Sequence, residues 1–236
     1  MSVDIPAPPA EFAQALRDAG IELDSGDEAR LTRYLHLLYA ANEHMNLTAV
    51  RDPAAAWMRH IFDGLTPLPI LTQADAKRVA DIGSGGGIPG LVLACVLPEV
   101  EFALIESVGK KARFLEETAR ALGLSKVRVS NARAEALGRG ELRDRMDVVV
   151  SRAVGRLPIL LEFALPMVRE GGVFVAIKGE QAAEELLTAT RALGFLKGAL
   201  VETRRTPTGT LVIIEKTAPT PRRYPRPVGE AAKSPL

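Results

Sequence analysis

The sequence has little of several features that mark other classes of protein. It contains one cysteine, Cys95, which excludes a framework of disulfide bonds and favours a reducing compartment. No apolar run reaches the roughly 18–20 residues of a membrane-spanning helix. The first residues lack the basic and apolar regions of a signal peptide. We therefore expect a cytoplasmic protein without a membrane partner.

A strong excess of charge and the common catalytic signatures are also missing. The formal net charge is only +1, so attraction of the whole molecule to nucleic acid is not indicated. No two histidines or cysteines have the spacing of metal ligands, and we predict no metal. The chain lacks both a Gly-x-Ser-x-Gly elbow and a phosphate loop ending in Gly-Lys-Ser/Thr.

What the sequence does contain is a large apolar fraction arranged in alternating strands and helices. Apolar residues make up 47% of the 236 residues, which is enough for a substantial core. From Lys77 onwards short apolar strands alternate with helical segments, and this predicts an α/β domain with a mostly parallel sheet. We expect that domain over 71–217, an N-terminal helical extension over 1–70 and a basic, proline-rich, irregular tail over 218–236.

The same patterns predict individual elements. Strands are expected at 79–82, 102–105, 127–129, 146–150, 173–177, 195–202 and 210–215. Helices are expected at 10–19, 27–42, 53–64, 91–97, 110–122, 158–168 and 180–193. Pro67 and Pro69 are expected to bound a linker into the central domain.

A glycine-rich turn between Asp81 and Gly90 is the strongest local signal. Five glycines fall within eight residues, after a buried strand and before a helix. Glycine accepts positive φ and lets a ligand approach the backbone without meeting a Cβ. A strand, a glycine turn and a helix in this order form the front half of a nucleotide-binding unit.

The identity of the nucleotide depends on how the glycines are read. Gly85-x-Gly87-x-x-Gly90 satisfies the dinucleotide fingerprint, which leaves an NAD-linked oxidoreductase as an alternative. Asp81-x-Gly83-x-Gly85-x-Gly87 instead resembles the first motif of S-adenosylmethionine-dependent methyltransferases. A carboxylate at the strand end suits a ligand with an ammonium and a sulfonium, whereas a pyrophosphate favours a helix N-terminus free of negative charge. An RNA-binding module with an empty glycine turn is the third possibility.

Ligands of parallel sheets bind at the carboxyl ends of the strands, so each strand end is a candidate site. Glu106 ends the second strand, close to the roughly 20-residue spacing from Asp81 at which an acid meets ribose hydroxyls. Its carboxylate can accept from both hydroxyls, although a solvated surface acid is the alternative. Ala134 and Glu135 follow the third strand, where an adenine ring would lie.

The fourth and fifth strands are each followed by a cation. Arg152 follows the apolar run 148–150 and Ser151, which indicates either the donor–acceptor junction or a salt bridge. Lys178 ends the fifth strand. With Arg59, His60 and Lys110 these residues would form a positive mouth for an anionic polymer, unless His60 is only structural.

Several separated motifs together resemble one known family. They are Asn46-Leu47-Thr48, Arg59-His60-Ile61-Phe62-Asp63, the stretch from Asp81 to Gly90, Gly109-Lys110-Lys111-Ala112-Arg113-Phe114-Leu115, Ser151-Arg152-Ala153, Lys178-Gly179 and Arg223-Tyr224-Pro225-Arg226. In this order they resemble the RsmG (GidB) family of bacterial 16S ribosomal RNA guanine-N7 methyltransferases. The resemblance covers essentially the whole chain.

The resemblance implies a Rossmann-like class I S-adenosylmethionine-dependent methyltransferase with an N-terminal helical extension. It implies S-adenosylmethionine as donor, with S-adenosylhomocysteine as product, and a guanine in 16S ribosomal RNA of the small ribosomal subunit as acceptor. We expect a monomer. The donor contacts that it implies are Gly83, Ile88, Ala134, Glu135 and Arg152. The family's usual aspartate at the second strand end is Glu106 here, and its frequent aromatic before Pro-Gly is Ile88.

Guanine N7 carries a free lone pair and no proton, so positioning should supply most of the rate. We expect Arg152, His60 and Lys178 to act at the reacting end, by holding phosphates or the O6 edge of the base. The residues expected to contact RNA are Asn46, Arg59, Lys110, Arg222, Arg223 and Arg226.

Overall fold

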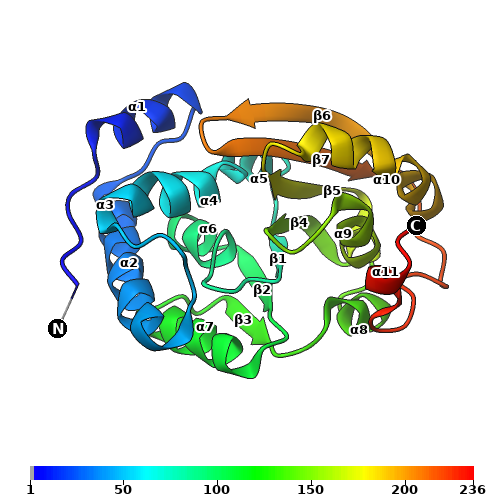
Figure 1. Ribbon diagram of the computed structural model, residues 1–236, viewed down its shortest axis with the longest axis horizontal. Coiled ribbons are helices and arrows are strands. Elements are labelled where there is room, and N and C mark those ends of the chain that lie inside the picture. Colours follow the sequence, from blue (N-terminus) through cyan, green and yellow to red (C-terminus); the bar gives the residue numbers. More distant parts are fainter. Residues whose placement is uncertain (1–2) are drawn as a thin grey trace.

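A seven-stranded sheet crosses the protein in its computed structural model, with helices on both faces (Figure 1). The structure describes residues 3–236, so the first two residues of the predicted N-terminal extension lie outside it. The strands are β1 (Arg78–Ile82), β2 (Glu101–Ile105), β3 (Val127–Ser130), β4 (Met146–Arg152), β5 (Val168–Lys178), β6 (Gly198–Thr206) and β7 (Gly209–Lys216).

The order of the strands is β3-β2-β1-β4-β5-β7-β6. Strand β7 runs antiparallel to β5 and β6, and the other neighbouring pairs are parallel. The predicted mostly parallel, seven-stranded α/β sheet is therefore confirmed. The carboxyl ends of β1, β2, β3, β4 and β5 meet at one edge, as parallel pairing requires.

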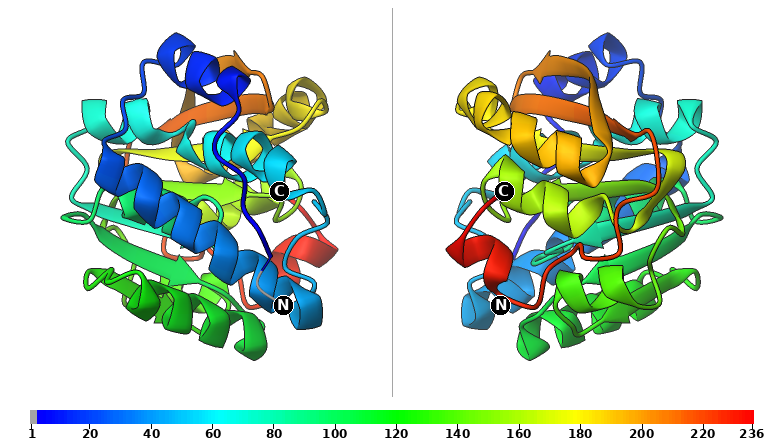
Figure 2. Two further views of the ribbon diagram at one scale, coloured as in Figure 1. Left: turned by 90° about the vertical axis from the view of Figure 1, so that its left-hand side faces the viewer. Right: turned by 90° about the vertical axis from the view of Figure 1, so that its right-hand side faces the viewer.

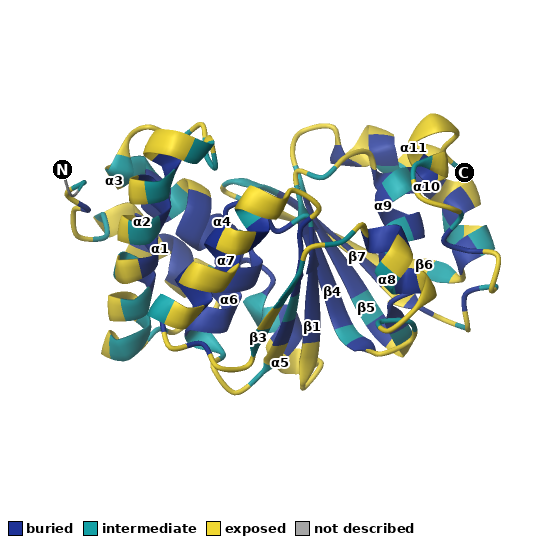
Figure 3. Ribbon diagram, turned by 90° about the horizontal axis from the view of Figure 1, so that it is seen from below, coloured by how far each residue is buried: buried dark blue, intermediate teal, exposed yellow. Residues whose placement is uncertain are grey.

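Helices complete two layers around the sheet. They are α1 (Ala10–Asp18), α2 (Ser25–Met45), α3 (Pro53–Ala56), the π-helix η1 (Trp57–Phe62), α4 (Asp63–Leu65), α5 (Leu68–Gln73), α6 (Gly90–Val96), α7 (Gly109–Ala121), α8 (Ala134–Arg139), α9 (Leu157–Ala164), α10 (Ala182–Leu196) and α11 (Glu230–Lys233). Figure 3 shows buried strands between a layer that contains α1, α2, α6 and α7 and a layer that contains α8, α9 and α10. Among residues 3–236, no helix combines the length and apolar character needed to cross a membrane.

The sheet is apolar on both faces because alternate side chains of a strand point to opposite sides. On β4, Val148 and Val150 join the core under the N-terminal helices, while Val149 joins the core under α9 and α10. All three are fully buried. This double burial explains why β4 reads as a nearly continuous apolar run.

Helix α2 attaches the N-terminal extension to the same core. Asp24 caps the helix by accepting from the backbone N–H of Asp27, whose side chain accepts from Asp24 in return, so the helix starts earlier than predicted. Tyr34 and Leu38 on its apolar face are fully buried. The hydroxyl of Tyr34 donates to the carbonyl of Gly86 at 2.8 Å, which ties the extension to the glycine turn.

The predicted linker between Pro67 and Pro69 is wrong, because this segment forms helix α5. Proline is tolerated in the first turn of a helix, where its missing N–H would have no intrahelical partner. Ile70 and Leu71 bury their side chains in the core, which supplies the stabilisation.

Two further element boundaries differ from the prediction. Helix α9 ends at Ala164 and β5 already begins at Val168. Strand β5 passes through Gly171, which has φ +72°, and its pairing with β4 has a register shift. The segment expected as a strand from 195 instead continues α10 to Leu196, whose side chain is fully buried. Lys197 then takes the left-handed conformation that ends the helix.

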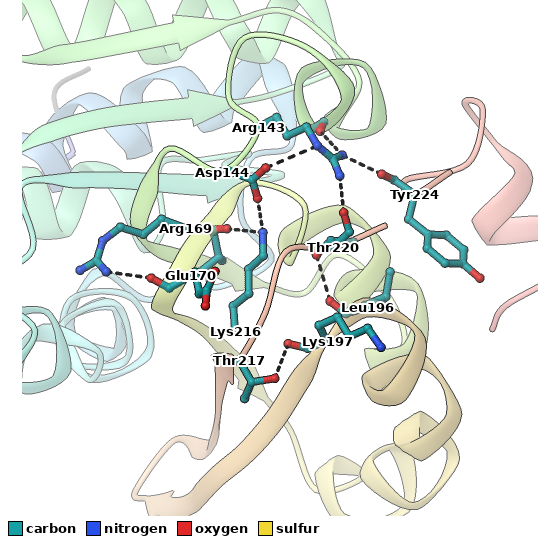
Figure 4. A network of polar contacts seen from close by, with 12 residues as sticks. Arg143, Asp144, Arg169, Glu170, Leu196, Lys197, Lys216, Thr217, Thr220 and Tyr224 are labelled. Carbon is teal, nitrogen blue, oxygen red and sulfur yellow. Dashed lines mark hydrogen bonds and ion pairs between the residues drawn. The ribbon is translucent and has the colours of Figure 1, made fainter. Parts of the chain in front are cut away.

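The tail after β7 is packed on the body of the protein, and it carries the short helix α11 beside α9 (Figure 2). Arg143 donates to the carbonyls of Thr220 and Tyr224, and the buried ammonium of Lys216 pairs with Asp144 at the start of the tail (Figure 4). Burial lowers the pKa of Lys216, although the Asp144 carboxylate opposes this. The tail is irregular as far as residue 229, as expected, but helix α11 was not predicted, and the backbone of the irregular part finds polar partners on the body of the protein.

Candidate functional site

Two neighbouring cavities open where the parallel strands end. The first has a volume of about 430 Å³ and is lined by the ends of β1 and β2, the start of α8, helix α9 and the C-terminal segment. The second has a volume of about 500 Å³ and is lined by the ends of β4 and β5 and by Asp63 and Thr208. Both volumes are typical of small-molecule sites. The loop after β4 separates them, since Val154 lines the first cavity while Arg152 and Ala153 line the second.

The glycine turn forms one end of the first cavity, and its backbone demands glycine. Gly83 has φ +70°, and a Cβ there would lie 2.4 Å from Cγ2 of Val154. Gly87 has φ +94°, and a Cβ on Gly90 would lie 2.6 Å from Oδ2 of Asp81. These close approaches explain the glycine spacing that the sequence displays. Ile88 is half-buried against the core and lies outside the lining of both cavities.

Asp81 is fully buried at the end of β1 and is only partly satisfied. Its Oδ2 accepts from the backbone N–H of Gly90 at 3.0 Å, while Oδ1 has no hydrogen-bond partner among the described residues. Burial raises the pKa of Asp81 to about 7. A buried carboxylate oxygen without a donor fits a cationic ligand beyond the glycine turn, because such a ligand favours the charged form.

Glu106 is buried, so the alternative of a solvated surface acid does not hold. Its Oε2 accepts from the N–H of Gly85 at 3.0 Å and its Oε1 from the N–H of Val108 at 2.7 Å. The carboxylate therefore braces the glycine turn against the end of β2. Each oxygen retains a second lone pair that can accept from a ligand hydroxyl.

Ala134 and Glu135 lie in the first turn of α8, which the sequence did not predict as a helix. Both line the first cavity and both are buried. Oε1 of Glu135 accepts from the backbone N–H of Gly229 at 3.0 Å, so this side chain also contacts the C-terminal segment. The rest of the lining includes the apolar side chains of Ile82, Ile105, Ile159 and Phe163, which suit the faces of an aromatic ring.

Arg152 forms the salt bridge that was one of its two predicted alternatives and also lines the second cavity. Its Nε lies 2.6 Å from Oδ2 of Asp63, and it donates to the carbonyl of Arg59 at 2.9 Å. Burial raises the pKa of Asp63, which the Arg152 guanidinium partly offsets. Thr208, in the turn between β6 and β7, donates to the other carboxylate oxygen. The sequence did not identify Asp63 as the partner of Arg152 or Thr208 as a partner of Asp63, because these residues come from distant elements.

Lys178 is paired rather than free. Its ammonium lies 2.8 Å from Oε2 of Glu185 and donates to the carbonyl of Gly155 at 2.7 Å. Glu185 also accepts from the backbone N–H of Leu157, so this group fixes the loop after β4. Lys178 also belongs to the lining of the second cavity.

His60 has the structural environment that was its alternative. It is buried in η1, and its Nε2 lies 2.7 Å from the hydroxyl of Thr48. Burial lowers the pKa of His60 to about 4, so the ring is neutral at pH 7. His60 is not among the side chains that line either cavity.

The expected RNA contacts divide into two groups. Five are exposed, namely Asn46, Arg59, Lys110, Arg222 and Arg223. Arg226 instead forms a bidentate ion pair with the fully buried carboxylate of Glu162, which raises the pKa of Arg226. Its guanidinium is therefore an anchor of the tail. No group of His, Cys, Asp and Glu within residues 3–236 is arranged to hold a metal ion.

Comparison with known proteins gives consistent matches over nearly the whole chain. The model of the GidB family, described as rRNA small subunit methyltransferase G, matches residues 27–210. The ribosomal RNA small subunit methyltransferase G of Sorangium cellulosum is 46% identical over 219 residues, which cover 92% of each chain. The protein of that name from Symbiobacterium thermophilum is 40% identical over 235 residues, which cover 94% of this chain and 96% of the relative.

Solved structures share the fold at low sequence identity. Cofactor-bound Rv0187 from MTB matches with a TM-score of 0.61 at 18% identity and covers 92% of this chain and 100% of that one. A methyltransferase from Geobacter sulfurreducens matches with a TM-score of 0.57 at 14% identity, over 89% and 100%. The fold is thus the Rossmann-like class I methyltransferase fold, as predicted. Because the family model covers more than half of the chain and both relatives span most of it, the chain belongs to the GidB family of rRNA small subunit methyltransferases G.

Proposed function

We propose that this protein transfers a methyl group from S-adenosylmethionine to N7 of a guanine in 16S ribosomal RNA. The observation that carries the proposal is the first cavity, with the unpartnered oxygen of Asp81 buried at the glycine turn and Glu106 at the next strand end. Membership of the family supports the ribosomal substrate. The proposed partner is 16S ribosomal RNA or the small ribosomal subunit in the cytoplasm, with the enzyme acting as a monomer.

The first cavity and the two acids beside its lining fit this donor in charge and shape, since Asp81 precedes the lining residues Ile82 and Gly83, and Glu106 lies between Ile105 and Ser107. Asp81 balances the cationic end through the glycine turn, and Glu106 accepts from the ribose hydroxyls. Gly83 and Gly85 leave room for the donor to approach the backbone closely. The small side chain of Ala134 leaves space for the adenine ring. When bound, S-adenosylmethionine supplies an electrophilic methyl group on its sulfonium.

The acceptor side works by positioning rather than by proton transfer. Guanine N7 is a nucleophile with no proton to lose, so the site needs no general base. Arg152, oriented by Asp63, donates to the O6 edge of the guanine or to an RNA phosphate. Lys178 holds the loop after β4, and Glu185 balances its charge at the second cavity. Holding N7 in line with the methyl group lowers the barrier through orientation.

Exposed cations would bind the rest of the RNA. Arg59 and Lys110 lie in η1 and at the start of α7, while Arg222 and Arg223 lie in the part of the tail beside the end of α10, away from the edge where the parallel strands end. Asn46 is exposed at the end of α2, where it can contact a sugar or base. Such contacts make binding dependent on salt, since each neutralised phosphate releases counterions.

The rival reading as an NAD-linked oxidoreductase makes a different prediction for the same cavity. Titration calorimetry with S-adenosylhomocysteine and with NAD separates the two, because the proposal expects heat only from the former. Incubation with labelled S-adenosylmethionine and small subunits that lack the modification should then label one guanine of 16S RNA. Binding of NAD alone, or labelling at a position other than guanine N7, would refute the proposal. An RNA-binding module without activity would bind neither small molecule.

A further inference from the structure

We propose that the C-terminal segment 228–232 is a wall of the donor cavity and determines how tightly the donor binds. This inference rests on the proposed function, because it concerns the ligand of the first cavity. It gives the tail a role beyond the RNA contacts expected from its arginines.

The segment contributes Val228, Gly229 and Ala232 to the lining of the first cavity. Ala134 at the start of α8 and Phe163 of α9 belong to the same lining. Val228 is 55% exposed, which is unusual for a branched apolar side chain in a packed segment. A ring bound in the cavity would cover it, and covering apolar surface favours binding.

The segment is anchored on its N-terminal side by a buried ion pair. The carboxylate of Glu162 on α9 is fully buried and accepts from the guanidinium of Arg226 at 2.8 Å and 2.6 Å. The backbone N–H of Arg226 donates to the same carboxylate at 2.8 Å. A buried charge requires such complete pairing, so the chain is fixed just before Val228.

Further hydrogen bonds hold the two residues that precede Arg226. Arg139 of α8 donates to the carbonyl of Pro225 at 2.7 Å, and Arg143 donates to the carbonyl of Tyr224 at 2.8 Å. The second of these bonds is visible in Figure 4. The position of the segment beside the cavity is therefore set by side chains of the body of the protein.

Glu135 connects the segment to the donor site itself. Its Oε1 accepts from the N–H of Gly229 at 3.0 Å, and Glu135 and Ala134 line the same cavity. Gly229 has φ +85°, which favours glycine at the point where the backbone turns toward Glu135. Because tail and donor meet at one residue, binding of one should stabilise the placement of the other.

The test measures the affinity for S-adenosylhomocysteine by titration calorimetry in the full-length protein. Val228→Asp places a charge in the apolar wall, and Ala232→Trp fills the cavity from an exposed helical position. We expect each to weaken binding about tenfold or more, while circular dichroism and the melting temperature stay close to those of the unaltered protein. Lys233→Ala is the matched control, since Lys233 is exposed on the same short helix and lies outside the lining.

A second readout needs no substitution. Hydrogen exchange at the amide of Gly229 should slow when S-adenosylhomocysteine is added, because the donor stabilises its bond to Glu135. Unchanged affinity in both cavity variants, or a raised KM for RNA without any change in donor affinity, would overturn the inference. If the unaltered protein does not bind S-adenosylhomocysteine, the proposed function itself fails. If that protein binds and both variants match it, only the role of the tail fails.

Discussion

Nε of Arg152 lies 2.6 Å from Oδ2 of Asp63, and this ion pair joins the end of β4 to helix α4. The side chain of Asp63 is 5% exposed and that of Arg152 is 26% exposed. The carboxylate is thus inside the protein, while part of the guanidinium faces the second cavity. The N-terminal extension therefore determines the direction of a cation at the proposed site of methyl transfer.

Arg152→Ala should lower kcat/KM for methyl transfer to 16S RNA on the order of 100-fold, because the acceptor loses its positioning group. Donor affinity should change much less. Asp63→Asn should give a smaller loss, since an amide can still accept from the guanidinium but does not balance its charge. Arg156→Ala, in the same loop with an exposed side chain, is the control for loss of positive charge. Equal activity of Arg152→Ala and Arg156→Ala would contradict the role.

Donor affinity should depend on pH through Asp81. Burial raises the pKa of Asp81 to about 7 in the free protein, and a cationic donor favours the charged carboxylate. Affinity for S-adenosylmethionine should therefore rise as pH increases from 6 to 8. Asp81→Asn keeps an acceptor for the N–H of Gly90 and should bind more weakly, without this dependence. Calorimetry of both proteins across this range isolates the effect, and parallel profiles would count against it.

The stability of the fold should also depend on pH through Asp81, but it should fall as pH rises, whereas donor affinity should increase. Its pKa is raised from 3.8 to about 7, so the folded state binds more protons than the unfolded state between these values. The free energy of unfolding should consequently fall as pH rises through this window. In Asp81→Asn this decline should be absent, as measured by urea denaturation at several pH values.

His60 should make stability depend on pH with the sign opposite to that of Asp81. It should not determine how methyl-transfer activity varies with pH. Its pKa is lowered from 6.5 to about 4, so the unfolded state binds more protons in that window and stability falls as pH drops. The loss relative to His60→Gln should be about 3 kcal/mol at full protonation. Methyl transfer by His60→Gln between pH 6 and 8 should follow the profile of the unaltered protein. A profile that changes on substitution would indicate proton transfer by His60.

Contacts between exposed cations and RNA should appear as a dependence on salt. Lys110→Ala and Arg59→Ala should each weaken binding of a 16S RNA fragment and lower the slope of log K against log salt by about one. Arg120→Ala, an exposed cation in the last turn of α7, is the control. Filter binding at several salt concentrations measures the slope. A loss that does not depend on salt would argue against phosphate contacts.

Several local elements followed from the sequence because their causes are local. The glycine spacing of 83–90 reflects positive φ and close approaches within one turn. The strand that ends at Ile82 and the one that ends at Arg152 are mostly apolar and are buried on both faces. By contrast, the prolines at 67 and 69 misled the prediction, since they occupy the start of α5 rather than a linker.

The sequence by itself determined the alternation of strands and helices, the glycine turn and the acids that end β1 and β2. These depend on hydrophobic period and backbone conformation over a few residues. Only the tertiary structure decided that Arg226 pairs with Glu162, 64 residues earlier, and that Arg152 bonds to the backbone of Arg59, 93 residues earlier. A charged residue looks the same in the sequence whether it is exposed to solvent or paired with a buried partner. Which of the two occurs depends on how distant elements pack together. For the same reason only the fold brought a proline-rich tail to the wall of the first cavity.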